Sequence, residues 1–363
     1  MPRIYKSVQS YFKIPKIIHL IGTNGKGTTG RFLATALHSL GFATGHYTSP
    51  HILKFNERVW LNGRDIDSDT LNFAHEELLK ILSEDNAKAL SYFEYTTLLA
   101  MWIYQDVDYV VLEAGLGGEF DATAVFEKEL TLVTPIDIDH QAFLGDTLKE
   151  IARTKLNAVQ KVAILASQRH EEVYEVAENI SDAKACKFNR LDDYIKSEDE
   201  EKIKNISHKL LLAPYLKDNL KLSISALNAL GIKYEVNNFM NSRLFGRLSR
   251  INENIIVDVG HNTLAAASIL DALEGEKYIL VYNSYRDKNY TEILSLLKPL
   301  IVHIEIIKID DERAEKQEVL QEVLQDLGIV HKIFNKIDKN KKYLVFGSFS
   351  VVESFLNSID GDF

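Results

Sequence analysis

Short β-branched runs alternate with segments whose apolar residues recur at helical spacing. In the N-terminal half, the strand-like runs cover residues 17–21, 109–112, 130–136 and 161–166. Apolar residues recur at helical spacing over 33–40 and 98–103, and Thr147 with Glu150 forms a capping box that predicts the start of another helix. Such alternation predicts an α/β fold with a mostly parallel sheet and helices on both faces.

A polar break at 236–247 separates this pattern from a second alternation. The strands predicted after the break cover 255–257, 278–281, 302–307 and 343–346, and the helices cover 264–273, 290–297, 312–327 and 350–357. We therefore predict two domains, residues 1–244 and 248–363. The charged run 191–204 predicts a solvated surface excursion.

Composition narrows the classes of protein. The 363 residues are 46% hydrophobic, and 42 Lys and Arg against 52 Asp and Glu give a net charge of -10. This balance argues against a nucleic-acid coat protein or a basic membrane-surface protein. The single Cys186 excludes an intramolecular disulfide, and no run reaches the ~18 apolar residues of a membrane helix. We expect a cytoplasmic protein without nucleic-acid or membrane partners.

The strongest chemical signal is GTNGKGT at 22–28, between a predicted strand and a predicted helix. Glycines let successive backbone N–H groups converge on an anion, and the helix N-terminus adds positive potential. Lys26 supplies a charge for the β- and γ-phosphates, and the hydroxyl of Thr28 is a candidate Mg²⁺ ligand. The motif predicts nucleotide binding, although Gly27 between Lys26 and Thr28 departs from the common P-loop spacing.

Three further residues follow or end predicted strands, where ligands of parallel sheets gather. They are Ser49 in TSPH, Glu113 before GLGG, and His140 in DIDH. Each has an ordinary structural alternative, namely a Ser-Pro turn, a capping carboxylate and a hydrogen-bonded histidine. Their convergence with Thr28 favours a Mg²⁺ site made mostly of oxygen ligands. In the second domain, Asp258 and His261 of DVGHN could hold a ribose or a phosphate, whereas capping by Asp258 or Asn262 is equally plausible.

Taken in order, GTNGKGT, TSPH, YFEY, LEAGLGGEFDAT, DIDH, FLGDTLKEIARTK, FGR and DVGHN resemble the folylpolyglutamate synthase/dihydrofolate synthase family of the Mur ligase superfamily. The resemblance runs from about residue 18 to residue 352. It implies an N-terminal P-loop-type ATPase domain that also binds the pterin, and a C-terminal Rossmann-like glutamate ligase domain. It also implies a monomer that adds L-glutamate to dihydropteroate or a reduced folate, using ATP and Mg²⁺, through an acyl phosphate.

The resemblance also assigns roles to individual residues. The implied catalytic residues are Lys26, His140 and Lys155, the last as a carbamoylated lysine that binds a second Mg²⁺. The implied metal ligands are Thr28, Ser49, Glu113, His140 and Lys155. The implied ATP-binding residues are Asn24, Gly25, Lys26, Gly27, Thr28, Asn219, Arg247, Asp258 and His261. The implied pterin-binding residues are Ser91, Tyr92, Phe93, Glu94, Phe120, Asp121 and Ala122.

Two other interpretations remain open. A Mur-type ligase could act on a cell-wall or other peptide acceptor, but YFEY and the GLGG-to-DAT string favour the folate branch. A non-catalytic nucleotide-binding regulator would have no need to keep Lys26, Glu113, His140 and Lys155. The residues alone leave open which of the two folate activities is present, the preferred reduced folate, the glutamate chain length and the glutamate-binding residues.

Overall fold

The computed structural model describes residues 1–359, which divide into two α/β units. Unit 1 comprises Met1–Leu212 and Leu216–Arg243, and unit 2 comprises Ala213–Tyr215 and the chain from Leu244 onward. The division falls inside the polar segment 236–247, and residues 360–363, the end of the predicted second domain, lie outside the described residues. The α/β class with two domains is confirmed. Among the described residues, no helix is long and apolar enough to cross a bilayer.

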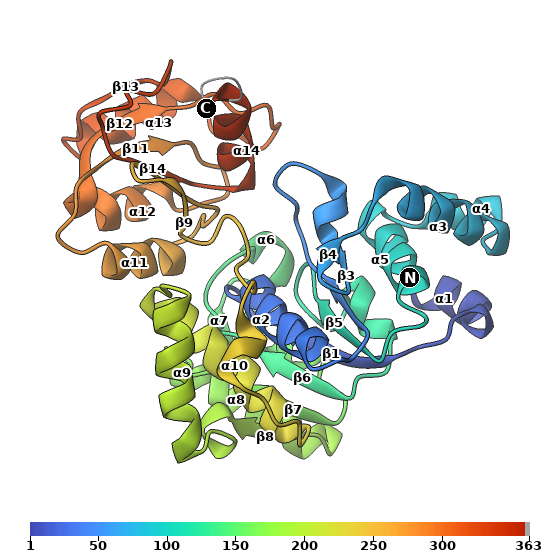
Figure 1. Cartoon of the computed structure of the whole chain (residues 1–363). Coiled ribbons are helices and arrows are strands. Elements are labelled where there is room, and N and C mark those ends of the chain that lie inside the picture. Colours follow the sequence, from blue (N-terminus) through green and yellow to red (C-terminus); the bar gives the residue numbers. More distant parts are fainter. Residues whose placement is uncertain (360–363) are drawn as a thin grey trace. The chain divides into compact units, whose positions relative to one another are not determined.

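Unit 1 contains a mixed sheet in the order β4-β3-β2-β5-β1-β6-β7-β8 (Figure 1). Its strands are β1 (Lys16–Ile21), β2 (Thr44–Tyr47), β3 (Val59–Leu61), β4 (Arg64–Asp65), β5 (Tyr109–Glu113), β6 (Leu130–Val133), β7 (Val162–Leu165) and β8 (Lys187–Arg190). All neighbours from β2 to β8 pair in parallel, and only β3 and β4 are antiparallel. Every residue of β5 is buried, as expected for a strand covered on both faces.

Helices and 3₁₀ turns connect these strands. The α-helices of unit 1 are α1 (Pro2–Val8), α2 (Lys26–Ser39), α3 (Ser68–Ile81), α4 (Glu84–Ala89), α5 (Tyr92–Ile103), α6 (Gln141–Leu144), α7 (Leu148–Leu156), α8 (Glu171–Lys184), α9 (Ser197–Lys209) and α10 (Pro214–Ala229), the first two residues of α10 being grouped with unit 2. The 3₁₀ turns are η1 (Gln9–Tyr11), η2 (Phe55–Arg58), η3 (Ala122–Val125), η4 (Leu191–Asp193) and η5 (Val236–Phe239). Thr147 and Glu150 form the predicted capping box of α7.

The prediction for 191–204 was wrong. Most of this charged run belongs to α9, which buries Ile203 and Ile206 on its inner side. Asp199 is also buried, because the hydroxyl of Tyr234 and the amide of Asn228 donate hydrogen bonds to its carboxylate. The predicted strand 130–136 ends early at Val133, since Pro135 has no backbone N–H to donate to the sheet.

Unit 2 contains a six-stranded sheet in the order β13-β12-β11-β14-β10-β9 (Figure 1). Its strands are β9 (Ser249–Asn252), β10 (Ile255–Asp258), β11 (Tyr278–Tyr282), β12 (Ile301–Ile306), β13 (His331–Ile333) and β14 (Tyr343–Phe346), of which only β9 is antiparallel. Its helices are α11 (Thr263–Ala272), α12 (Tyr290–Leu297), η6 (Lys298–Leu300), α13 (Gln317–Asp326) and α14 (Phe349–Ile359). The strands β10, β11 and β14 are fully buried.

The topology of unit 1 places the sequence motifs together. The strands β2, β5, β1 and β6 are consecutive in the sheet and parallel, so their carboxyl ends share one edge. The segments that follow them begin at Thr48, Ala114, Gly22 and Thr134. Ligands of open α/β sheets bind outside this edge, where successive connections leave in opposite directions.

Candidate active site

The glycine-rich loop 22–25 connects β1 to α2 through two left-handed glycines. Gly22 has φ of 136°, and a Cβ atom there would lie 2.0 Å from Thr134 Oγ1, so no larger residue fits. Gly25 has φ of 91° and occupies the N-cap position of α2, which has no side-chain cap. The first turn of α2 is therefore left for an anion to complete.

Two predicted ATP-binding side chains contact this loop. The ammonium of Lys26 donates hydrogen bonds to the carbonyl oxygens of Gly22 and Thr23, each at 3.2 Å. The buried side chain of Asn219, from α10, packs against Gly25, where a Cβ atom would lie 2.4 Å from Asn219 Oδ1. Gly25 and Asn219, 194 positions apart in the sequence, thus meet because α10 packs beside the loop.

The surroundings of the Thr28 hydroxyl indicate whether a metal ion fits this loop. Thr28 is buried in the first turn of α2, and its Oγ1 has no hydrogen-bond partner among the described residues. A buried hydroxyl without a partner is unfavourable, and a cation or its water shell would satisfy it. Thr29 and Thr35 also carry unpaired hydroxyls, but Thr28 is distinguished by its place three residues after Gly25.

A buried carboxylate lies at the end of β5. Glu113 is only 5% exposed, and its Oε2 accepts hydrogen bonds from the Thr48 hydroxyl and, at 3.4 Å, from the Ser49 backbone N–H. The parallel pairing of β2 with β5 causes this approach, since Tyr47 is in register with Leu112. Glu113 and Ser49 therefore lie beside each other, and both carry side-chain oxygen atoms of the kind that Mg²⁺ prefers.

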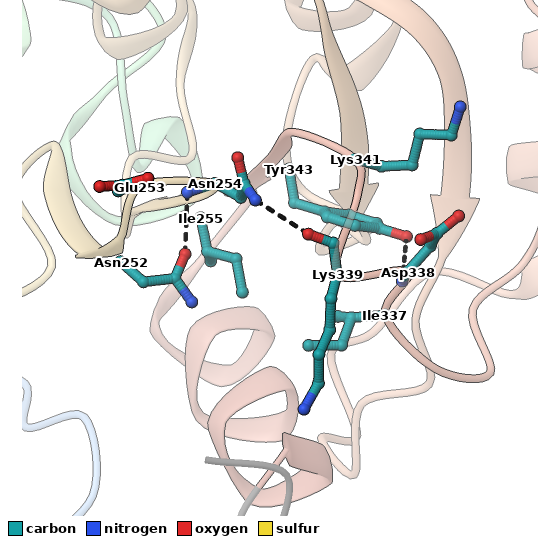
Figure 2. A pocket seen from close by; sticks show the side chains of 9 residues that line it. All are labelled: Asn252, Glu253, Asn254, Ile255, Ile337, Asp338, Lys339, Lys341 and Tyr343. Carbon is teal, nitrogen blue, oxygen red and sulfur yellow. Dashed lines mark hydrogen bonds between the residues drawn. The ribbon is translucent and has the colours of Figure 1, made fainter.

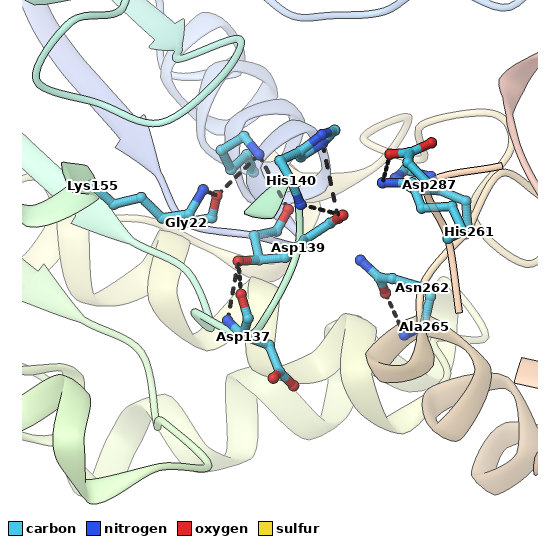
Figure 3. Close-up of polar contacts among 12 residues, drawn as sticks. Gly22, Asp137, Asp139, His140, Lys155, His261, Asn262, Ala265 and Asp287 are labelled. Carbon is cyan, nitrogen blue, oxygen red and sulfur yellow. Dashed lines mark hydrogen bonds and ion pairs between the residues drawn. The ribbon is translucent and has the colours of Figure 1, made fainter. Parts of the chain in front are cut away.

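His140 lies on the neighbouring loop after β6. It has φ of 53° and precedes α6, and its Nε2 lies 3.9 Å from the buried carboxylate of Asp139 (Figure 3). The loop is attached to the phosphate loop, because Thr23 Oγ1 bonds the carbonyl and the N–H of Asp137, both at 3.1 Å. His140 thus stands beside an acidic group that sequence reasoning did not single out.

Lys155 projects from α7 toward the same loop. Its buried ammonium donates a hydrogen bond to the Gly22 carbonyl at 2.9 Å (Figure 3), so one carbonyl accepts from both Lys155 and Lys26. Burial, with a smaller contribution from the charge of Lys26, lowers the pKa of Lys155 to about 7. A large fraction of Lys155 is therefore a neutral amine at physiological pH. Lys155 therefore does not face solvent, although it lies two turns along a surface helix.

The predicted pterin-binding residues at the start of α5 differ from one another in exposure and in contacts. Ser91 and Glu94 form a capping box at the start of α5, with the Ser91 N–H donating to Glu94 Oε2 at 2.8 Å. Phe93 packs beneath Gly115, where a Cβ atom would lie 2.5 Å from Phe93 Cζ. Tyr92 is 61% exposed, so its ring is available to a ligand.

The predicted pterin residues after β5 likewise divide into exposed and buried ones. Phe120 is 86% exposed, whereas Ala122 is buried at the start of η3. The buried carboxylate of Asp121 accepts hydrogen bonds from the N–H of Leu116 at 2.9 Å and from the N–H and hydroxyl of Thr123. Asp121 therefore holds the loop closed, and Phe120 presents its ring.

In unit 2, Asp258 ends β10 and is buried. Its carboxylate accepts hydrogen bonds from the Tyr215 hydroxyl at 3.0 Å and from the N–H groups of Leu248 and Gly260, both at 2.8 Å. Burial raises the pKa of Asp258, and the charge of Arg247 opposes that effect. The Arg247 guanidinium also lies 5.2 Å from the centre of the Phe349 ring.

The other two members of DVGHN differ in role. Asn262 caps α11, since its Oδ1 accepts a hydrogen bond from the Ala265 N–H at 2.9 Å (Figure 3), which bears out the capping alternative for this residue. The His261 ring is half-buried, with Nδ1 3.2 Å from the Val259 carbonyl. Within unit 2, Arg247, Asp258 and His261 all lie near the carboxyl end of β10.

A pocket of about 340 Å³ lies at the opposite end of the same strands (Figure 2). Ile255 and Tyr343, which begin β10 and β14, form part of its wall together with Ile337, and Lys339 and Asp338 also line it. Ligands of parallel sheets gather at carboxyl ends, whereas this pocket opens at the amino ends. It contains none of the predicted site residues.

Sequence reasoning missed several side chains around the site. Thr48 and Asp139 are adjacent to predicted residues but were not singled out. Arg58 was also missed, although its guanidinium lies 5.5 Å from the ring centre of Tyr92 and 5.7 Å from that of Phe55. No local spacing signals Arg58, because η2 and α5 meet only through the tertiary fold.

Comparison with known proteins identifies the family. No family model matches the chain. The dihydrofolate synthase/folylpolyglutamate synthase of Haemophilus influenzae is 30% identical in an alignment 395 positions long, which covers 94% of this chain and 88% of that protein. The chain belongs to the dihydrofolate synthase/folylpolyglutamate synthase family. The resemblance inferred from the motifs is confirmed.

Solved structures agree with this assignment to the dihydrofolate synthase/folylpolyglutamate synthase family. The crystal structure of Helicobacter pylori folylpolyglutamate synthetase superposes with a TM-score of 0.81 and 38% identity, covering 99% of this chain and 93% of that one. Escherichia coli FolC, in complex with DHPP and ADP, superposes with a TM-score of 0.82 and 25% identity, covering 99% of this chain and 92% of that one.

Proposed function

We propose that this protein is an ATP-dependent ligase that adds L-glutamate to dihydropteroate, to reduced folates, or to both. Membership of the dihydrofolate synthase/folylpolyglutamate synthase family supports the reaction class. The observation that carries the proposal is the edge of unit 1, where the phosphate loop follows β1, Glu113 ends β5, His140 lies on the loop after β6, and Lys155 of α7 donates a hydrogen bond to the phosphate loop. Such an edge suits a reaction between two anions, a nucleotide and a carboxylate.

The chemistry divides among the residues of this edge. The terminal carboxylate of the pteroyl substrate attacks the γ-phosphorus of ATP, which forms an acyl phosphate and releases ADP. The amine of L-glutamate then attacks the acyl carbon, and the tetrahedral intermediate expels phosphate to leave an amide. Lys26 and the N-terminus of α2 stabilise charge on the phosphates, since fixed charges aimed at a transition state supply much of an enzyme's rate. Exclusion of water protects the acyl phosphate.

Thr28, Ser49, Glu113 and His140 are the proposed Mg²⁺ ligands. The unpaired buried hydroxyl of Thr28 and the buried carboxylate of Glu113 support this set. When bound, Mg²⁺ would neutralise charge on the phosphates of ATP.

Lys155 is the proposed site of carbamoylation and of the second Mg²⁺. Only a neutral amine reacts with CO₂, and the pKa of about 7 leaves much of Lys155 in that form. Addition of CO₂ forms an N–C bond and releases one proton, and the product is an anionic oxygen ligand. The nearby ammonium of Lys26 would favour that anion.

We further propose a division of labour along the chain. Residues 1–244 bind ATP and the pteroyl substrate, and residues 248–363 form the glutamate ligase domain, with Arg247, Asp258 and His261 as ATP contacts. The protein works as a cytoplasmic monomer with small-molecule substrates and no nucleic-acid or membrane partner. Light scattering of the purified chain tests the monomer.

The test of function is ADP release by purified protein. Dihydropteroate, tetrahydrofolate and a nucleotide-sugar peptide are offered separately, each with and without L-glutamate. Release that requires glutamate and a pteroyl acceptor supports the proposal, and the more active acceptor identifies the activity. Release only with the peptide would assign a Mur-type ligase, and nucleotide binding without release under any condition would assign a non-catalytic regulator.

A further inference from the structure

A chain of buried hydrogen bonds runs from the middle of β1 to the loop that carries Phe120. His19 on β1 is fully buried, and its Nε2 lies 2.8 Å from Thr123 Oγ1. The Thr123 hydroxyl donates to Asp121 Oδ1 at 2.6 Å. Because that hydroxyl has a single proton, it accepts from His19, which places the imidazole proton on Nε2.

Asp121, at the other end of this chain, closes the loop 116–121. Its Oδ1 also accepts the Thr123 N–H, and its Oδ2 accepts the Leu116 N–H, both at 2.9 Å. The first residue of the loop and the first turn of η3 are therefore joined by one carboxylate. Leu116 and Phe120 face outward between these bonds, 37% and 86% exposed.

A buried lysine supports the same 3₁₀ turn from beneath. Lys128 is 2% exposed, and its ammonium donates a hydrogen bond to the Ala124 carbonyl at 2.6 Å. Burial, together with the charge of Lys128, lowers the pKa of His19 well below its usual value. His19 therefore stays neutral and remains a single hydrogen-bond donor to Thr123.

We propose that His19 and Thr123 are positioning residues for the pteroyl substrate, which hold Asp121 and so fix the loop that presents Phe120. This inference rests on the proposed function. Both residues are fully buried, so we assign them no contact with the substrate. Buried carboxylates with several donors are held in one geometry, so loss of a donor frees the loop. The phosphate loop 22–25 depends on different contacts, with Thr134, Asn219 and Lys155.

The test compares Thr123→Val with a matched control in the same sheet. Thr131 on β6 is in register with His19 and is buried, and its hydroxyl has no partner among the described residues. Thr131→Val therefore also removes one buried threonine hydroxyl, but it leaves the hydrogen bonds among His19, Thr123 and Asp121 in place. We expect Thr123→Val to raise KM for the preferred pteroyl acceptor about tenfold, the order expected for a lost hydrogen bond to a charged group. KM for ATP should change less than twofold.

Conservative variants separate positioning from bulk stability. Thr123→Ser keeps the hydroxyl and should retain the wild-type KM for the acceptor. His19→Gln keeps a nitrogen donor and should be less impaired than His19→Ala. Equal acceptor KM values for Thr123→Val and Thr131→Val, or a parallel rise in KM for ATP, would overturn the inference.

Amide hydrogen exchange tests the hydrogen bonds of the loop 116–121 without any assay of the proposed function. The Leu116 and Thr123 amides should exchange faster in Thr123→Val than in Thr131→Val, because both donate to Asp121. If the wild type used no pteroyl acceptor, the proposed function would fail while faster exchange could still be observed. If the wild type used one and exchange were unchanged, the positioning role alone would fail.

Discussion

The loop 22–25 after β1 and the loop 116–121 after β5 are held in shape by different interactions. The phosphate loop 22–25 is shaped by its own sequence, since two left-handed glycines and the start of α2 define it. The loop 116–121 is closed by the carboxylate of Asp121, which a side chain from β1 supports through Thr123. Both loops lie in sequence motifs, but the hydrogen bonds that close the second loop depend on a residue about a hundred positions away. Local backbone chemistry can be predicted from a sequence, but distant hydrogen bonds cannot.

Lys26→Ala is expected to have the largest effect, confined to the phosphate loop. Loss of the charge over the phosphates should lower kcat by on the order of 10²-fold or more. The half-buried side chain donates hydrogen bonds to the loop carbonyls of Gly22 and Thr23 and is not part of the core, so the melting temperature should stay close to that of the wild type. Steady-state ADP release and thermal melting measure both. Near wild-type turnover would refute the phosphate-loop assignment.

Lys155→Ala should act on the phosphate loop, because only the contacts of the side chain are lost. The Lys155 ammonium donates a hydrogen bond to the Gly22 carbonyl, whereas the backbone carbonyl that packs against Gly118 is unchanged by the substitution. We expect loss of most activity, with partial rescue by formate or acetate occupying the vacated oxygen positions. Turnover with and without these anions measures the rescue, and chloride serves as the control salt. Full activity of the variant would exclude the carbamate role.

Glu113→Gln should act at the end of β5, just before the loop 116–121. Loss of the carboxylate charge should raise the Mg²⁺ concentration for half-maximal activity roughly tenfold, by analogy with ligand-shell substitutions. His140→Ala should shift it in the same direction. Titration of activity with MgCl₂ measures the shift, and Thr131→Val is the control. An unchanged Mg²⁺ requirement in Glu113→Gln would make its role structural.

Lys128→Met should have the smallest effect, a change in how stability depends on pH. Burial lowers the pKa of Lys128 to about 7, below its unfolded value, so the unfolded state binds more protons between pH 7 and the usual lysine range. Stability from this group therefore rises with pH across that window. The wild type should gain more stability than Lys128→Met between pH 7 and pH 9.5 in urea melts. Parallel pH profiles would contradict the assignment.

The residues that sequence could place are those in motifs at strand ends. Glu113 ends β5, Lys26 and Thr28 lie in the first turn of α2, and His140 lies on the loop after β6, all near the edge expected, because parallel strands deliver successive connections to one edge. The burial of Lys155 was not predicted from its spacing on α7, since packing against Gly118 and Gly22 decides it.

The elements that sequence reasoning missed lack periodic signals. The short pair β3 and β4 has few residues, and α9 carries many charges. In α9 only Ile203 and Ile206 mark the buried side within a run of acidic and basic residues, so composition concealed the helix. From the sequence, helix capping and ligand binding were equally supported for the DVGHN segment. The structure shows that Asn262 caps α11, because its side chain accepts a hydrogen bond from the Ala265 N–H.

Isotope transfer is the most direct test of the central claim, that this site activates a pteroyl carboxylate with ATP. The pteroyl acceptor is prepared with oxygen-18 in its terminal carboxylate and incubated with ATP, Mg²⁺, L-glutamate and the enzyme. The account predicts that one labelled oxygen appears in inorganic phosphate for each amide formed, because the carboxylate oxygen stays with phosphorus when the acyl phosphate breaks down. Amide formation with unlabelled phosphate would contradict it.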